Sequence, residues 1–191
     1  MELSELQKNI LNSPNNRSII MSSAASGKTT LMTEKVRQLL RAGVNPKEIA
    51  VITFTNMAAA ELRQRLGQDY KDGLFVGTIH ALANWMLLTS GIKTDKVLNN
   101  EEFDELFLMV EKNPICIKHI EWVLLDEAQD TNEQQFKFLF DMINPDYFFI
   151  VGDIKQSIYR FRSADVSSYL KIKELFMAMI PKKYRQEGAN A

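Results

Sequence analysis

Short apolar runs alternate along the chain with stretches in which apolar residues recur at helical spacing. Continuous apolar runs bounded by turn residues are typical of strands that are buried on both faces. The runs predict strands over residues 19–21, 49–54, 75–79, 121–125, 147–151 and 176–180. The stretches between them predict helices over residues 3–11, 30–41, 57–66, 80–88, 101–111, 132–143 and 165–175. This alternation predicts an α/β fold, with a parallel sheet flanked by helices.

Polar residues next to the helical patterns predict where helices begin. Ser4, Asn56 and Asn100 each precede such a pattern and can accept a hydrogen bond from a backbone N–H of its first turn. Residues 91–100 contain turn residues and predict a connection without regular structure. The length of 191 residues suits one large domain or two small ones, and one sizeable core is possible.

Composition restricts the partners and the compartment. A formal net charge of −1 gives no overall attraction to nucleic acid, so any DNA contact has to come from a local patch. The single cysteine, Cys116, allows no internal disulfide and fits a reducing compartment. No apolar stretch has the length of a membrane span, and residues 1–5 lack a signal pattern. We therefore expect a cytoplasmic protein with no membrane partner.

Residues 18–30 have the order strand, loop and helix that is typical of a phosphate-binding loop. Gly27-Lys28-Thr29 ends the loop, so Lys28 is expected to reach the β- and γ-phosphates and the Thr29 hydroxyl to ligate Mg²⁺. Ser22 and Ala25 stand where glycines are usual, which leaves open a simple small-residue turn. Backbone N–H groups of one segment are expected to bind phosphate, namely Ser23, Ala24, Ala25, Ser26, Gly27, Lys28, Thr29 and Thr30.

Two adjacent acids follow the predicted strand 121–125 directly. Beside a phosphate loop, one carboxylate is needed at the metal and one at the attacking water. We assign Asp126 to the metal and Glu127 to the water. The alternative is a pair of acids that only favours the N-terminus of a following helix.

The segment 152–162 combines an amide, two aromatic residues and three cations between a predicted strand and helix. Gln156 is a candidate for holding the γ-phosphate or the water, and Arg162 for stabilising charge on the transferred phosphoryl group. Tyr159 and Phe161 are candidate platforms for bases, or alternatively core residues. Ligands of parallel sheets bind at the carboxyl ends of the strands, and the candidate residues all follow strands: Lys28, Thr53, Thr78, Asp126 and Gln156.

In these segments the chain resembles the N-terminal ATPase half of superfamily 1 helicases of the UvrD/Rep/PcrA type, and also AddA and RecB helicases. Residues 53–62 resemble the family's motif Ia, 77–80 motif Ib, 126–132 motif II and 152–162 motif III. Tyr184-Arg185 resembles the start of motif IV, and Gln7 matches the adenine-reading glutamine of the Q motif. The resemblance covers essentially the whole chain.

The resemblance implies a RecA-like P-loop NTPase domain that binds ATP, Mg²⁺ and single-stranded DNA and steps 3′ to 5′. Gln7 would read adenine, on which Tyr184 would stack. The residues implied around the Mg²⁺–ATP phosphates are Lys28, Thr29, Asp126, Glu127, Gln156, Arg162 and Arg185. Those implied along DNA are Phe54, Asn56, Thr78, His80, Tyr159 and Phe161.

Simpler roles stay open for several of these residues. Taken alone, Gln7 is better explained as a solvated helix residue, and His80 as an ordinary histidine at a helix N-terminus. Phe54 is equally well explained as part of the sheet core. Met57 replaces a lysine that is usual in the family, and Thr30 an arginine. Both replacements predict weaker contacts, to phosphate and to nucleotide respectively.

The family usually has a large helical subdomain between motifs Ib and II, and residues 91–118 leave room only for a reduced one. The chain stops just after motif IV, so the second RecA-like domain is expected as a missing partner. That domain normally supplies an arginine, and we expect a monomer that binds ATP more readily than it hydrolyses it. The alternative is a nucleotide-gated DNA-binding or scaffolding module with little hydrolysis. A small-molecule kinase does not explain residues 126–130 and 156–162 together.

Overall fold

A computed structural model describes residues 3–13, 17–21, 27–99 and 103–152. The predicted helix 165–175 and strand 176–180 lie outside these residues. So do ten of the predicted site residues, which are Ser23, Ala24, Ala25, Ser26, Gln156, Tyr159, Phe161, Arg162, Tyr184 and Arg185.

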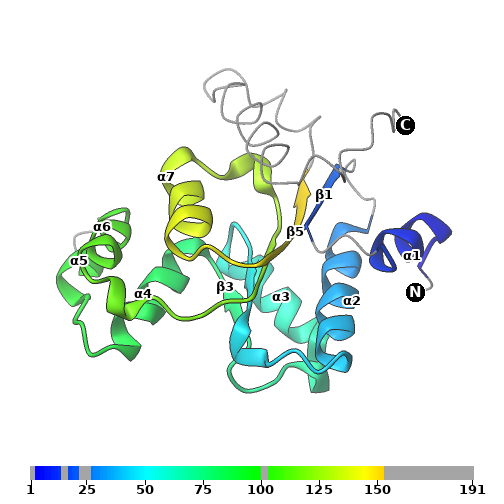
Figure 1. Cartoon of the computed structure of the whole chain (residues 1–191), viewed down its shortest axis with the longest axis horizontal. Coiled ribbons are helices and arrows are strands. Elements are labelled where there is room, and N and C mark those ends of the chain that lie inside the picture. The colour runs from blue at the N-terminus through cyan, green and yellow to red at the C-terminus, as the bar shows by residue number, and fades with distance from the viewer. Residues whose placement is uncertain (1–2, 14–16, 22–26, 100–102, 153–191) are drawn as a thin grey trace.

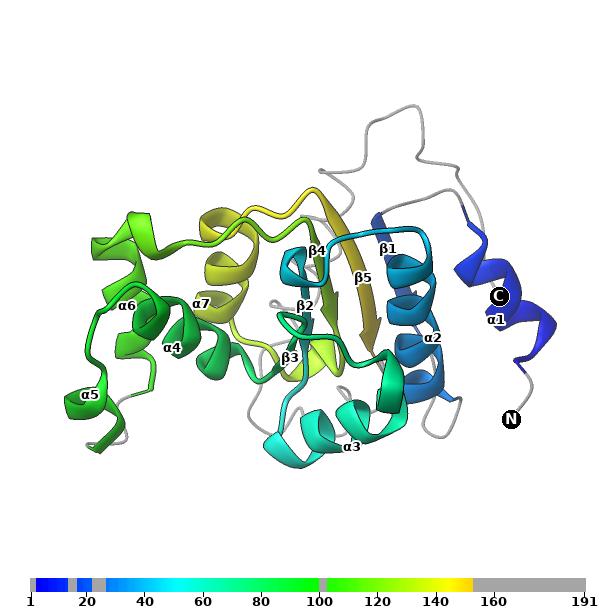
Figure 2. The same ribbon diagram turned by 90° about the horizontal axis from the view of Figure 1, so that it is seen from below.

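The described residues form a five-stranded sheet in the order β1-β5-β4-β2-β3, and every pairing is parallel. Figures 1 and 2 show the strands side by side at the centre of the molecule. The strands are β1 (Arg17–Met21), β2 (Ile49–Ile52), β3 (Phe75–Gly77), β4 (Trp122–Leu125) and β5 (Tyr147–Gly152). The α/β fold with a parallel sheet is therefore confirmed.

Helices cover both faces of this sheet. They are α1 (Glu5–Leu11), α2 (Lys28–Arg41), α3 (Asn56–Leu66), α4 (Ile79–Thr89), α5 (Asp95–Asn99), α6 (Glu105–Lys112) and α7 (Glu133–Phe136), which continues as a π-helical segment (Lys137–Met142). Short 3₁₀ turns are Pro46–Glu48, Gly67–Asp69, Pro114–Cys116 and Ala128–Asp130. None of the described helices combines the length and apolarity of a membrane span.

Side-chain alternation along the strands builds two cores. In β2, Ala50 and Ile52 face the core shared with α4, α6 and α7, whereas Ile49 and Val51 face the core shared with α1, α2 and α3. Figure 2 shows α2 on one side of the sheet and α4, α6 and α7 on the other. Every residue of β2 and β4 is buried, which explains why these strands are uniformly apolar in sequence.

Two predicted helix starts are placed differently. The hydroxyl of Thr55, not the side chain of Asn56, accepts the N–H of Ala58 (3.1 Å), because Thr55 has an extended backbone and Asn56 is already helical. Helix α6 begins at Glu105, preceded by Asp104, and Asn100 lies outside the described residues. The prediction for Ser4 is confirmed, since its hydroxyl accepts the N–H of Gln7.

The connection predicted over residues 91–100 contains a helix, α5, so this prediction was wrong. The buried Thr94 fixes its start, since its hydroxyl donates to Asn84 Oδ1 (2.6 Å) and its carbonyl accepts the N–H of Val97 (3.0 Å). Val97 is itself buried in the core beside α4 and α6. The segment 91–118 thus contributes two helices that pack against the domain.

Candidate functional site

The ends of three neighbouring strands are tied together by backbone hydrogen bonds just beyond the strands. The N–H of Thr53 donates to Gly77 O, and the N–H of Asp126 donates to Ile52 O, both at 2.9 Å. Residues that follow β2, β3 and β4 therefore meet at the carboxyl edge of the sheet, as predicted. Phe54, Thr78 and Asp126 line one pocket there.

The central contact of the site joins two residues that are 99 positions apart. Lys28 Nζ lies 3.2 Å from Glu127 Oε2. Lys28 is the first residue of α2 and follows Gly27, whose φ of 79° belongs to the left-handed region. The lysine side chain is 10% exposed and the glutamate 33%, so the pair is shielded yet reachable. The lysine of the predicted phosphate loop thus faces the carboxylate predicted to activate water.

The backbone at Glu127 separates two adjacent carboxylates. Glu127 has φ 50° and ψ 47°, a left-handed conformation that is uncommon for a residue other than glycine. Its N–H donates to Asp126 Oδ1 (3.0 Å), while its own side chain reaches Lys28. The left-handed turn therefore gives the two acids different partners, as the two different roles predicted for them would need.

Asp126 is a buried carboxyl group whose charge is only partly compensated. Burial raises the pKa of Asp126 to about 6, and the nearby charge of Glu127 adds to this rise. The N–H of Glu127 and the charge of Lys28 act in the opposite direction. A buried oxygen ligand next to a second carboxylate suits a hard divalent cation, which would relieve both unfavourable effects. The donor set fits Mg²⁺.

Gln7 lies against the glycine of the phosphate loop. A Cβ atom built on Gly27 would come within 2.8 Å of Gln7 Nε2. The amide is oriented from its other end, because Gln7 Oε1 accepts the N–H of Ser4 (2.9 Å) in the capping box of α1. Gln7 is partly exposed and lies next to Gly27. Thr29 and Thr30 lie in the first turn of α2, where the carbonyl of Thr29 accepts the hydroxyl of Thr33 (2.7 Å).

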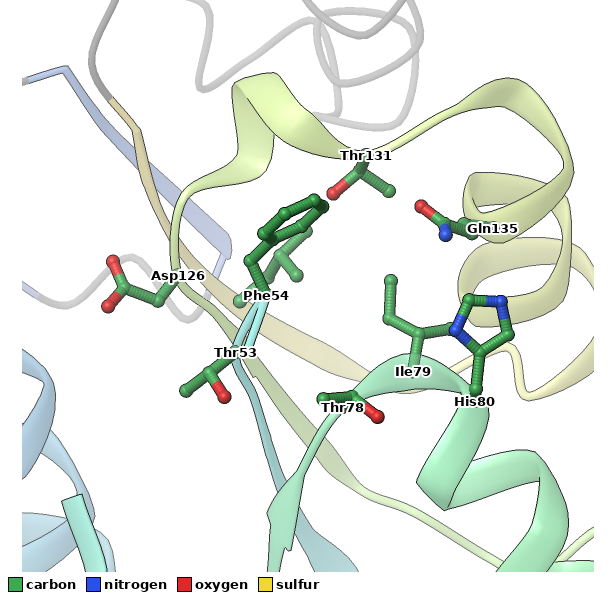
Figure 3. Close-up of a pocket in the computed structure, with 9 residues that line it drawn as sticks. Thr53, Phe54, Thr78, Ile79, His80, Asp126, Thr131 and Gln135 are labelled. Carbon is green, nitrogen blue, oxygen red and sulfur yellow. The ribbon is translucent and has the colours of Figure 1, made fainter. Parts of the chain in front are cut away.

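Three of the residues predicted to contact DNA, Phe54, Thr78 and His80, line a pocket of about 210 Å³ (Figure 3). Its lining residues are Thr53, Phe54, Thr78, Ile79, His80, Leu125, Asp126, Thr131 and Gln135. Phe54 is 53% exposed and does not belong to the sheet core, because β2 ends at Ile52. Asn56 is exposed at the start of α3, and the Thr78 hydroxyl accepts the N–H of Ala81 as the cap of α4.

His80 is held by α6 and its preceding residues. Its Nε2 atom lies 3.0 Å from Asp104 Oδ1, and its ring stacks on Phe107 with centroids 5.0 Å apart. Phe103 approaches from a further side, with ring centroids 6.0 Å apart. The position at the start of α4 is that of an ordinary helix N-terminus, but the ring is fixed at the rim of the pocket.

Thr131 and Gln135 line the same pocket and were not among the predicted site residues. Gln135 lies in the predicted helix 132–143, and Thr131 directly precedes that helix. The sequence feature that could have indicated the position of Gln135 is the capping-box spacing of Asn132 and Gln135, which marks the start of a helix. Gln135 N–H donates to Asn132 Oδ1 (2.9 Å), and Asn132 N–H donates to Gln135 Oε1 (3.1 Å).

Comparison with known proteins agrees with this geometry. The sequence model of the UvrD/REP helicase N-terminal domain matches residues 3–112 and 111–177. The chain is 26% identical over 263 aligned residues to the ATP-dependent DNA helicase Rep of Escherichia coli, covering 89% of this chain and 39% of Rep. It is 34% identical over 154 residues to a probable DNA helicase of Mycoplasma pneumoniae, covering 70% of this chain and 29% of that protein.

A solved structure supports the fold. The crystal structure of Pif1 helicase from Candida albicans aligns with a TM-score of 0.50 at 17% identity, covering 80% of this chain and 33% of Pif1. The described sheet and its flanking helices are thus RecA-like. The family match extends over most of the sequence. The chain belongs to the UvrD/REP helicase N-terminal domain family.

Proposed function

We propose that this chain is the ATP-binding motor domain of a DNA helicase or translocase. The observation that carries the proposal is the 3.2 Å contact of Lys28 with Glu127, beside the buried Asp126, at the carboxyl edge of a parallel sheet. A cation for phosphate, a metal ligand and a carboxylate for water are the parts that phosphoryl transfer to water needs.

Each part of Mg²⁺–ATP has a candidate binding residue in this site. The N-terminus of α2 after Gly27 would hold phosphate oxygens, with Lys28 supplying the cation. Thr29 and Asp126 would hold Mg²⁺, which when bound neutralises charge on the phosphates. Gln7, beside Gly27, would contact adenine. In this proposal the Lys28–Glu127 ion pair holds the lysine in place until phosphate arrives.

Phosphate binding would then change the partners of both residues. Lys28 would turn from Glu127 towards the phosphate oxygens, because these carry more negative charge than one carboxylate. Glu127 Oε2, released from the ion pair, would accept a proton from the attacking water. Asp126 would stay deprotonated beside the cation, and the left-handed turn at Glu127 would keep the two carboxylates in their separate roles.

We propose single-stranded DNA as the second ligand, with 3′ to 5′ stepping as in the family that the chain resembles. Phe54, which lines the pocket, is an exposed apolar side chain, at 53% exposure. Stacking of a base on an exposed aromatic ring contributes about 1–3 kcal/mol and requires no net positive charge. A second RecA-like domain would complete the ATP site, since an arginine supplied across such a site raises the rate on the order of 10³–10⁵-fold.

The test is ATP turnover by this chain with and without single-stranded DNA. Turnover that rises with DNA supports a motor domain. ATP binding without turnover, restored when a second RecA-like domain is added, supports one half of a shared active site. ATP binding with DNA affinity that depends on nucleotide, but with no turnover in either case, would instead support the nucleotide-gated binding module. Absence of ATP binding would contradict the proposal.

A further inference from the structure

The two ends of the Gln7 side-chain amide have different neighbours. Its Oε1 atom accepts the backbone N–H of Ser4 (2.9 Å), and its Nε2 atom lies 2.8 Å from the position that a Cβ of Gly27 would occupy. A backbone N–H can only donate, so the end of the amide beside Ser4 has to be the oxygen. The amino group is consequently the end that faces Gly27, the residue that precedes Lys28 and α2.

Helix α1, which carries Gln7, is held against the rest of the domain. Leu11 is buried in the core that contains residues of α2 and α3, and Leu3 and Ile10 pack against that core. Figures 1 and 2 show α1 beside α2, the helix that follows Gly27. A helix of seven residues is not stable by itself, so this packing and the hydrogen bonds at its start determine the position of Gln7.

The capping box of α1 contains two hydrogen bonds, which Ser4 makes through different atoms. The Ser4 hydroxyl accepts the backbone N–H of Gln7 (3.2 Å) and so stabilises the start of the helix. The backbone N–H of Ser4 binds the Gln7 side chain instead and determines which way the amide points. Rotation of the amide by half a turn would place its amino group against this N–H, and two donors repel each other. The helix start and the amide orientation therefore depend on different atoms of one residue.

An amide held in this orientation offers a hydrogen-bond donor to a nucleotide. In the proposed function Gln7 contacts the adenine of ATP, whose ring nitrogens are acceptors. The amino group of Gln7 can donate to one of them while Oε1 keeps its bond to Ser4. An amide that rotated freely would present the productive end for only part of the time, and ordering it on binding would cost affinity.

We propose that Ser4 is a positioning residue for nucleobase recognition, and that its backbone N–H, rather than its hydroxyl, carries this role. The proposal rests on the proposed function, in which Gln7 contacts adenine. Ser4 acts through the Gln7 amide and not through a contact of its own with the nucleotide. Its contribution is therefore specific to the base, and binding of the phosphates alone does not depend on it.

The test compares Ser4→Pro with Ser4→Ala. Ser4 has φ −65° and ψ 159°, a conformation that proline adopts without strain, and proline lacks the backbone N–H. Both variants lose the hydroxyl, but alanine keeps the N–H for Gln7 Oε1, so the difference between them isolates this one donor. Isothermal titration calorimetry measures the affinity of each variant for Mg²⁺–ATP and for inorganic triphosphate with Mg²⁺, which has no base. We expect Ser4→Pro to bind ATP about fivefold more weakly than Ser4→Ala, and triphosphate equally well.

The same pair of variants is then compared in a chain that carries Gln7→Ala. Without the amide, Ser4→Pro and Ser4→Ala should bind ATP equally. A difference that persisted without Gln7, or a loss on triphosphate as large as that on ATP, would overturn the role of Ser4 while leaving ATP binding intact. Equal ATP affinity of the two variants in the presence of Gln7 would overturn it as well. If the wild-type chain bound neither ATP nor triphosphate, the proposed function would fail and this role of Ser4 with it.

Discussion

The side-chain amide of Gln7 occupies the space into which a side chain on Gly27 would project, 2.8 Å from the position of its Cβ. The side chain of Gln7 on α1 is thereby matched in shape to Gly27, which precedes α2. Gly27 is required both by this contact and by its left-handed backbone, with φ 79°. The contact links the predicted adenine reader to the predicted phosphate site before nucleotide binds.

Gly27→Ala is therefore expected to lose stability through backbone strain and through the clash with Gln7. We expect a decrease of about 2 kcal/mol or more in the free energy of unfolding, measured by urea denaturation. Gly43→Ala is the matched control, since Gly43 has φ 86° and nothing within 4 Å of a Cβ. It should lose only about 1 kcal/mol. Equal losses would show that the Gln7 contact is irrelevant, as would a failure of Gln7→Ala to restore part of the difference.

Asp126→Asn is expected to stabilise the nucleotide-free protein near neutral pH. The pKa of Asp126 is raised from 3.8 to about 6 in the folded state, so folding binds protons between these values. Wild-type stability should fall as pH rises through this window, whereas the amide does not titrate. At pH 7 to 8 the variant should be more stable by about 2 kcal/mol, and the advantage should shrink towards pH 4.

Urea denaturation of the two proteins across this pH range measures the difference. Asp72→Asn, which changes an exposed carboxylate, should show no comparable gain. Mg²⁺ and nucleotide should reverse the order by stabilising only the wild type. A gain that stayed constant from pH 4 to pH 8 would be inconsistent with a raised pKa of Asp126.

The pH dependence of stability is expected to have the opposite sign for Lys35, which lies in α2 on the other side of the sheet from α4 and α6. Its side chain lies in the core, with Nζ 4.9 Å from the ring centre of Trp122 and 5.5 Å from that of Phe149. Burial lowers the pKa of Lys35, so the folded state binds fewer protons than the unfolded state at pH values between the lowered pKa and the ordinary value of 10.5. Wild-type stability should therefore rise with pH relative to Lys35→Met, as measured by denaturation at pH 7 and pH 10. Lys93→Met, at an exposed position, should not change with pH in this way.

Asp104 is expected to support DNA binding through His80. Asp104→Ala removes the 3.0 Å contact with His80 Nε2 and frees the ring that stacks on Phe107. We expect affinity for single-stranded DNA to fall about two- to fivefold, with ATP affinity unchanged. Asp95→Ala on α5 is the control. Parallel losses of DNA and ATP binding would indicate general destabilisation instead.

Sequence patterns were sufficient to predict the strands, most of the helices and the residues that follow each strand. Uniformly apolar strands and the residues that follow them predicted the sheet and the meeting of Lys28 with Glu127 at its edge. The prediction of Asn56 as the cap of α3 was wrong because the neighbouring Thr55 can also accept a hydrogen bond from the first turn. Only the backbone geometry shows that Thr55 is the residue that does so. The helix α5 was missed because one buried valine, Val97, makes no helical period.

Contacts that depend on how the helices pack were not predicted from the sequence. The stacking of His80 on Phe107 depends on how α6 packs against α4. Neither a histidine nor a phenylalanine in the sequence indicates such a contact. Likewise, the sequence does not distinguish Gln135 from other polar residues of the predicted helix 132–143. A helical pattern does not indicate which strands lie next to the first turn of the helix. The roles of Gln156, Arg162, Tyr184 and Arg185 stay predictions from the resemblance.

The most direct test of the central claim separates nucleotide binding from turnover in two variants of the Lys28–Glu127 pair. Lys28→Ala should lose at least about tenfold in ATP affinity, because the phosphates lose their cation. Glu127→Gln should bind ATP as well as the wild type or better, yet reduce DNA-stimulated turnover about 10²–10⁴-fold, because an amide cannot take the proton from water. Glu121→Gln should match the wild type. Wild-type turnover by Glu127→Gln would contradict the assignment of Glu127 as the residue that activates water.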